Sequence, residues 1–205
     1  IARALAAGRS VLYLLPEIAL TTQITNRLRL FFGDEMGVYH SKFPDSERVE
    51  IWKKQMSPKP YRLIVGVRSS LFLPHRNLGL VIVDEEHEPS YKQEDPSPRY
   101  NARDAAIVLA SMQGAKTVLG TATPSLETFS NAKAGKYALV TLSERYGDVL
   151  LPEIRVEDVK ELRRKKIMKT SLSPELLSEM GKALEARQQI ILFQNRRGYA
   201  SYLEC

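Results

Sequence analysis

Short apolar runs that alternate with amphipathic stretches constrain the fold of this chain most strongly. The runs are far shorter than the roughly 20 residues that a transmembrane helix needs, and their length is typical of buried strands. They cover residues 11–15, 36–39, 62–66, 78–83, 117–119 and 137–142. Helices are predicted between them, over residues 18–32, 46–56, 102–113 and 125–134. Buried strands separated by helices predict an α/β fold, a parallel sheet with helices on both faces.

The pattern changes after Leu142, where we expect a connector and then a second domain. Residues 160–169 are strongly basic and are interpreted either as a solvated linker or as a loop that faces DNA. Ser173 and Pro174 are typical of a helix start, and this helix is expected to reach about Ala186. Short strands are predicted before and after these segments, over residues 153–156 and 189–193.

Composition and charge limit the kind of protein that this chain can be. The 205 residues are 43% hydrophobic and 26% charged, as in ordinary globular proteins. A net charge of +6 favours a polyanionic partner such as nucleic acid. A single cysteine, Cys205, excludes a disulfide within the chain and fits a reducing cytoplasm. No signal peptide is visible in the sequence, and because it opens at Ile1 without a Met we expect further residues upstream.

An acidic cluster follows the strand predicted over residues 78–83. It reads Asp84-Glu85-Glu86-His87 and lies at a strand's carboxyl end, where parallel sheets bind ligands. Buried carboxylates need a compensating cation, and Mg²⁺ held by an aspartate with substrate phosphates is a natural one. We therefore expect Asp84 to hold Mg²⁺ and Glu85 to act as general base on the water in nucleotide hydrolysis. The alternative interpretation is a solvated acidic turn.

A second polar segment, Gly120-Thr121-Ala122-Thr123-Pro124-Ser125, follows the strand predicted over residues 117–119. Small hydroxyl side chains at such a turn suit hydrogen bonds with a neighbouring histidine or acid, and His87 is the expected partner of Thr121 and Thr123. Thr123 before Pro124 is also typical of a helix start, with Thr123 as the N-cap. The two interpretations are compatible, and both are retained.

Together the two segments resemble the Walker B box, in its Asp-Glu-Glu-His form, and motif III of superfamily 2 helicases. The resemblance implies a RecA-like lobe of the P-loop NTPase class, in which His87, Thr121 and Thr123 couple ATP hydrolysis to movement on DNA. Residues 15–21 and 65–72 resemble motifs Ia and Ib, which makes Thr21 and Arg68 candidates for contacts with the DNA backbone. Ordinary strand-end loops are the alternative for these two segments.

Residues 87–104 are similar to the segment that follows Walker B in bacterial primosomal replication-restart helicases, and the resemblance covers nearly the whole chain. It implies an aromatic-rich loop that senses single-stranded DNA and signals to the ATPase site. The candidate contacts are two stacking rings and three cations: Tyr91, Tyr100, Lys92, Arg99 and Arg103. Alternatively, the tyrosines only attach the loop to the domain.

Residues 190–199 include Asn195-Arg196-Arg197-Gly198 and are also similar to this family, with Gln194 in place of its usual leucine. The resemblance places a zinc-binding insertion just beyond, so Cys205 is a candidate zinc ligand in a longer parent protein. A structural zinc site takes four ligands, and no Zn²⁺ is expected in this chain. Residues 1–145 are then helicase lobe 1, and residues 146–205 a linker and the incomplete start of lobe 2.

The resemblance implies an ATP-dependent 3′→5′ DNA helicase of replication restart and primosome assembly, in the bacterial cytoplasm and associated with the nucleoid. Its implied cofactors are ATP and Mg²⁺. Its implied partners are single-stranded and forked DNA, primosome proteins and single-strand-binding proteins, with no membrane. The sequence contains no Gly-x-x-x-x-Gly-Lys-Ser/Thr, so this chain alone is expected to be inactive. A non-catalytic nucleic-acid-binding module on a degenerate lobe, or another superfamily 2 translocase, are the alternatives.

Overall fold

The computed structural model describes residues 1–17, 19–20, 22–144, 147, 152–168 and 170–193. The chain divides into two compact units, Ile1–Thr141 and Leu142–Cys205, and each is considered by itself. Among the described residues, no helix is both long enough and apolar enough to cross a membrane.

The first unit is built on a five-stranded sheet in the order β2-β3-β1-β4-β5, and every pair of neighbours is parallel. The strands are β1 (Ser10–Leu14), β2 (Met36–Tyr39), β3 (Leu63–Gly66), β4 (Leu78–Val83) and β5 (Lys116–Leu119). Leu14 pairs with Gly66 on one side and with Val83 on the other, and Val83 pairs with Leu119. The carboxyl ends of β1, β3, β4 and β5 are therefore level, and the segments that follow them leave from one edge.

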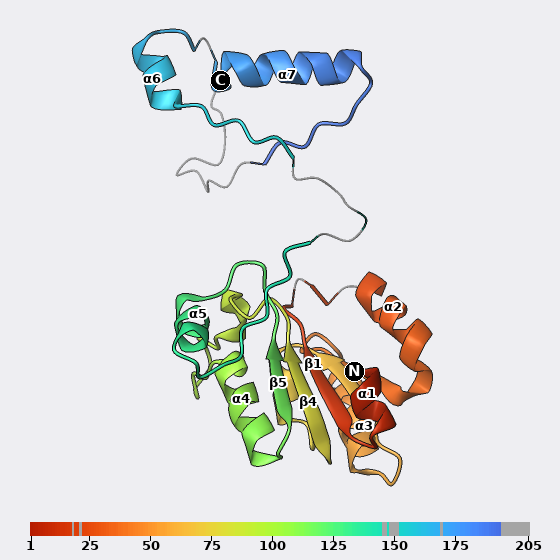
Figure 1. Ribbon diagram of the computed structural model, residues 1–205. Coiled ribbons are helices and arrows are strands. Elements are labelled where there is room, and N and C mark those ends of the chain that lie inside the picture. Colours follow the sequence, from red (N-terminus) through yellow and green to blue (C-terminus); the bar gives the residue numbers. More distant parts are fainter. Residues whose placement is uncertain (18, 21, 145–146, 148–151, 169, 194–205) are drawn as a thin grey trace. The chain divides into compact units, whose positions relative to one another are not determined.

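Helices cover both faces of this sheet, which confirms the predicted α/β architecture (Figure 1). They are α1 (Ala2–Ala6), α2 (Thr22–Phe32), α3 (Asp45–Met56), α4 (Ala102–Met112) and α5 (Leu126–Lys133), with 3₁₀ turns η1 (Gly33–Glu35), η2 (Arg68–Phe72) and η3 (Pro89–Tyr91). One core cluster joins the sheet to α1 and α2, and the other joins it to α3 and α4.

Helix α4 packs on β4 and β5, and its buried residues form a stripe of small side chains. Ala102, Ala106 and Ala110 recur every four residues along one side of the helix, and all three are buried. Because these side chains are single methyl groups, the helix backbone lies close to the sheet.

The strand predicted over residues 137–142 is absent, and this prediction was wrong. The segment has no ladder partner among the described residues, and Leu139, Val140 and Leu142 are 52%, 79% and 90% exposed. The strands predicted over residues 153–156 and 189–193 are absent for the same reason. An apolar run forms a strand only where the edge of another strand satisfies its backbone groups.

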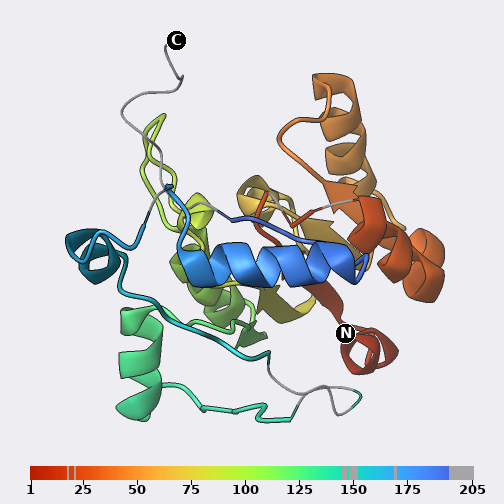
Figure 2. The ribbon, with the colours of Figure 1, turned by 90° about the horizontal axis from the view of Figure 1, so that it is seen from above.

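The second unit contains α6 (Val159–Arg164) and α7 (Pro174–Glu185). Ser173 caps α7 by accepting a hydrogen bond from the Leu176 amide, which confirms the predicted start, and Figure 2 shows α7 as one straight helix. The basic residues 160–169 are not simply a loop, because most of α6 lies within them. Asp158 caps this helix, and Glu161 pairs with Lys165 at i,i+4 spacing.

Gly66, at the end of β3, has no space for a side chain. A Cβ atom there would lie 2.7 Å from Ser70 Cβ and from the carbonyl oxygen of Tyr39. We expect Gly66→Ala to lower the free energy of unfolding by about 1–3 kcal/mol, measured by urea denaturation. Gly120→Ala is the matched control, because its Cβ would make only an ordinary 3.4 Å contact with Asp84 Oδ1. Equal losses in the two variants would contradict this account.

Candidate active site

The acidic cluster leaves the level edge of the sheet between β1 and β5. The Asp84 amide donates to the Leu14 carbonyl at 3.0 Å, and the Glu86 amide donates to the Gly120 carbonyl at 3.0 Å. Between them Glu85 has a φ of 46°, in the left-handed region that is uncommon for residues other than glycine. Such backbone conformations persist where surrounding contacts hold them, and they cluster at functional sites. This turn leaves the Glu85 side chain 47% exposed.

Asp84 is held by a tyrosine from the neighbouring strand. Tyr13, in β1, donates its hydroxyl hydrogen to Asp84 Oδ2 at 2.8 Å, and the Glu85 amide donates to Oδ1 at 3.1 Å. Burial, together with the hydrogen bond to Asp84, raises the pKa of Tyr13, so the phenol stays a donor. Sequence reasoning missed this contact. Each carboxylate oxygen has a further lone pair, so an oriented aspartate at this edge fits the single protein ligand that Mg²⁺ often takes beside phosphates.

His87 bridges the acidic cluster and the segment after β5, as predicted. Its Nδ1 lies 2.7 Å from Thr121 Oγ1 and 3.6 Å from a carboxylate oxygen of Glu85, and its Nε2 lies 3.3 Å from Thr123 Oγ1. The predicted helix start at Thr123 was wrong by two residues. Ser125 is the N-cap of α5, and its hydroxyl accepts a hydrogen bond from the Thr128 amide. The threonines are therefore free of a capping role and face the histidine.

Glu86 is the buried member of the cluster, and its countercharge is an arginine of the protein. The side chains of Glu86 and Arg103 are 0% and 12% exposed, and their closest charged atoms are 3.0 Å apart. Glu86 Oε1 accepts from the Ser125 amide at 2.7 Å. Oε2 accepts from Arg103, from the Ser125 hydroxyl at 3.1 Å and from the Thr128 hydroxyl at 2.8 Å. The cation that sequence reasoning required for the buried carboxylate is thus supplied by α4.

These hydrogen bonds keep Glu86 ionised. Burial raises the pKa of Glu86, but hydrogen bonds from the Ser125 amide, the Thr128 hydroxyl and Arg103 together outweigh burial, and its pKa falls below the ordinary value. The stability that this carboxylate contributes is therefore present above its unfolded-state pKa and is lost as the pH falls through the lower folded-state pKa.

Arg103 is consequently not the free DNA-facing cation that was predicted. Its guanidinium also donates to the Ser125 hydroxyl at 2.8 Å and to Asp104 at 2.8 Å. Sequence reasoning placed it with the cations of the loop because it follows that loop closely. The first turn of α4 instead directs its side chain inward, to the acidic cluster.

The loop over residues 92–101 is closed at its base and presents two cations. Lys92 and Asn101 form an isolated antiparallel bridge, and the Gln93 amide donates to the Tyr100 carbonyl at 2.8 Å. Arg68 donates to the carbonyl oxygens of Ser90 and Lys92 at 3.2 and 3.0 Å, so it holds the start of the loop. The side chains of Lys92 and Arg99 are exposed.

The two tyrosines of this segment differ in position. Tyr91 is only 1% exposed, and its hydroxyl lies 2.7 Å from the Asp84 carbonyl and 3.1 Å from that of Leu14. Its predicted role as a stacking ring is wrong for this structure, because the ring is part of the core and attaches the loop to the domain. Tyr100 is half-buried and packs edge-on against Phe72, with ring centroids 5.0 Å apart. Phe72 is 57% exposed, and sequence reasoning gave it no role.

Comparison with known proteins decides the family. The model of the DEAD/DEAH box helicase family matches residues 1–132. This chain belongs to the DEAD/DEAH box helicase family. The chain is also similar to proteins named replication restart protein PriA. It is 47% identical to the one from Rickettsia conorii over all of the chain and 31% of that relative. Identity to the Chlamydia pneumoniae protein is 42%, over 98% of the chain and 27% of the relative. Identity to the Bacillus subtilis protein is 40%, over all of the chain and 25% of the relative.

The matches confirm the resemblance to replication-restart helicases that the motifs indicated. The chain spans between a quarter and a third of the length of the curated relatives it matches. The segment Asp84-Glu85-Glu86-His87 follows β4 at the carboxyl edge of the sheet, next to residues 120–125.

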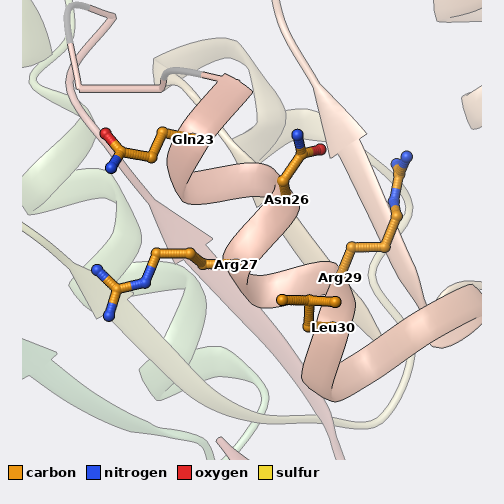
Figure 3. Close-up of a pocket in the computed structure, with 5 residues that line it drawn as sticks. All are labelled: Gln23, Asn26, Arg27, Arg29 and Leu30. Atoms are coloured by element: carbon orange, nitrogen blue, oxygen red, sulfur yellow. The ribbon is translucent and has the colours of Figure 1, made fainter.

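Several predicted site residues are not part of this cluster. Thr21, Cys205 and the Asn195-Arg196-Arg197-Gly198 segment lie outside the described residues. No group of three or more His, Cys, Asp or Glu suited to a metal ion occurs in the described part of the chain. A surface pocket on α2 contains none of the predicted site residues and is shown in Figure 3; it is lined by Gln23, Asn26, Arg27, Arg29 and Leu30.

Proposed function

We propose that this chain is part of a longer ATP-dependent DNA helicase, in which it supplies the Mg²⁺ ligand and the general base of ATP hydrolysis and couples hydrolysis to the DNA-binding segments. The observation that carries the proposal is the His87 bridge, which joins Glu85 to the hydroxyls of Thr121 and Thr123. Coupling of ATP hydrolysis to movement on DNA needs a contact between the candidate general base and the turn after β5, and His87 makes that contact. Similarity to replication restart proteins makes replication restart the favoured process.

The residues of the cluster divide the work of hydrolysis. Asp84 would hold Mg²⁺, which neutralises phosphate charge when it is bound. Glu85 would orient and deprotonate the attacking water, a role that suits its partly exposed carboxylate. His87 would sense the state of Glu85 and shift the segment that carries Thr121 and Thr123.

The DNA-facing side of the proposal rests on the loop over residues 92–101. Lys92 and Arg99 would contact the backbone of single-stranded DNA, and Tyr100 with Phe72 would offer aromatic surface to a base. Movement would be 3′→5′ on forked DNA, in the bacterial cytoplasm with primosome and single-strand-binding proteins. Zn²⁺ would belong only to the longer protein, with Cys205 as a ligand.

The test is ATP hydrolysis by the longer protein, with and without single-stranded DNA. We expect strong stimulation by DNA, weaker stimulation by RNA of the same sequence, and no turnover by the 205-residue chain, which has no phosphate-loop motif. DNA binding without turnover in the longer protein would instead support a non-catalytic binding module, and a preference for RNA would support another kind of translocase.

A further inference from the structure

The Glu86 network connects three elements of the first unit. Glu86 follows β4, Arg103 lies in the first turn of α4, and Ser125 and Thr128 begin α5. One carboxylate accepts from all of them, and Arg103 also donates directly to the Ser125 hydroxyl. The start of α5 is therefore fixed to the acidic cluster by both partners of a buried ion pair.

Stability alone does not explain this arrangement. Replacing a buried ion pair by well-packed apolar residues is often neutral or stabilising, so such a pair is weak evidence for a stability role. A carboxylate with four donors does fix geometry, because each donor must reach a lone pair at hydrogen-bond distance. The network thus sets where the start of α5 lies relative to Glu86.

That position determines the surroundings of His87. Glu86 and His87 are adjacent, and they hold the same segment at different points. The Glu86 amide holds Gly120, its carboxylate holds Ser125, and the His87 ring contacts Thr121 and Thr123 between them. If Ser125 is released from Glu86, the segment that carries Thr121 and Thr123 is held at Gly120 only.

Arg103 also stands directly after the closed loop. The Arg103 amide donates to the side chain of Asn101 at 2.9 Å, and Asn101 bridges to Lys92 at the loop's base. We propose that Arg103 is a positioning residue, which holds the segment facing His87 in place through Glu86 and so joins the loop over residues 92–101 to the hydrolysis site. The kinetic part of this inference rests on the proposed function.

The first readout does not require ATP turnover. The 205-residue chain has three histidines, so the imidazole nitrogen resonances of His87 are assignable with a His87→Gln variant. Thr121→Val removes one ring contact directly and supplies the reference spectrum for a displaced segment. We expect Arg103→Met to move the His87 resonances toward that reference and Arg103→Lys to restore them in part. Asp104→Asn removes the negative charge of the exposed partner of the same arginine and should leave the His87 resonances unchanged.

Arg103→Met leaves a buried carboxylate without its countercharge, and this variant could fail to fold. Thr128→Val then decides, because it removes one donor to Glu86 and keeps both charges and the side-chain shape. A folded Thr128→Val or Arg103→Met protein whose His87 resonances match the wild type would overturn the proposal.

The second readout is kinetic and uses the longer protein. We expect Arg103→Met to lower kcat for DNA-stimulated hydrolysis by about 10²-fold, the effect of misplacing a catalytic group by about 1 Å, with KM for ATP little changed. Asp104→Asn should match the wild type. A wild-type protein without turnover would defeat the proposed function alone, since the His87 resonances still test the positioning. Unchanged kcat in a folded Arg103→Met protein would refute the joining of the loop to the hydrolysis site.

Discussion

Glu85→Gln in the longer protein will reduce DNA-stimulated ATP hydrolysis by about 10²–10⁴-fold, the usual contribution of a positioned general base. Glutamine keeps the size and the hydrogen-bonding shape of glutamate but cannot take a proton from water. Because the Glu85 side chain is 47% exposed and contributes little packing, the fold should be unaffected. Steady-state turnover with saturating single-stranded DNA is the measurement, and circular dichroism checks the fold.

Glu88→Gln is the matched control for this prediction. Glu88 lies in the same acidic segment, and its amide donates to the Glu85 carbonyl at 2.8 Å, so the substitution removes an equal charge from nearby. We expect it to keep most of the activity. If both variants lost activity equally, the effect would come from the charge of the segment and Glu85 would not be the base.

Tyr91→Ala will destabilise the first unit by about 3–5 kcal/mol, the range for removing a large aromatic side chain from a core. The ring is 1% exposed and packs in the core cluster shared by the sheet and α4. Urea denaturation followed by circular dichroism measures the loss. Loss of this ring should also release the start of the loop over residues 92–101.

Tyr91→Phe separates packing from hydrogen bonding at this position. It keeps the ring and removes only the hydroxyl that lies 2.7 Å from the Asp84 carbonyl, so we expect a loss of about 1–3 kcal/mol. The opposite pattern, a Tyr91→Ala protein of unchanged stability that no longer binds single-stranded DNA, would restore the interpretation of Tyr91 as a stacking residue.

Local signals in the sequence were enough to predict the sheet. The strands over residues 36–39 and 78–83 have the predicted bounds, and the parallel direction of the strands follows from the helices between them. The same signals failed over residues 137–142, because an apolar run does not reveal whether a neighbouring strand is present. The contact of His87 with Thr121 was predictable because both follow strands that were expected to end at one edge.

The contacts of the site that sequence reasoning missed all depend on side-chain direction. Tyr13 and Asp84 are 71 positions apart, and nothing local indicates that the phenol reaches the carboxylate. An arginine beside a predicted DNA-binding loop is expected to face DNA, and only the placement of α4 shows that Arg103 points toward Glu86. Tyr91 was predicted to stack on DNA because its segment resembles an aromatic-rich loop, whereas the turn η3 places it in the core, as the alternative interpretation held.

The alanine stripe of α4 limits how far the helix can lie from the sheet, and so affects the geometry of the site. Ala102, Ala106 and Ala110 are the buried residues of this helix, so the distance of its first turn from the sheet is set largely by their methyl groups. Arg103 follows the first of these alanines, so a bulkier residue at position 102 would lift the guanidinium away from Glu86. Substitution at these three positions is therefore limited by the length of the Arg103 side chain as well as by packing. Larger side chains between α4 and the sheet would leave the buried Glu86 carboxylate in need of another cation.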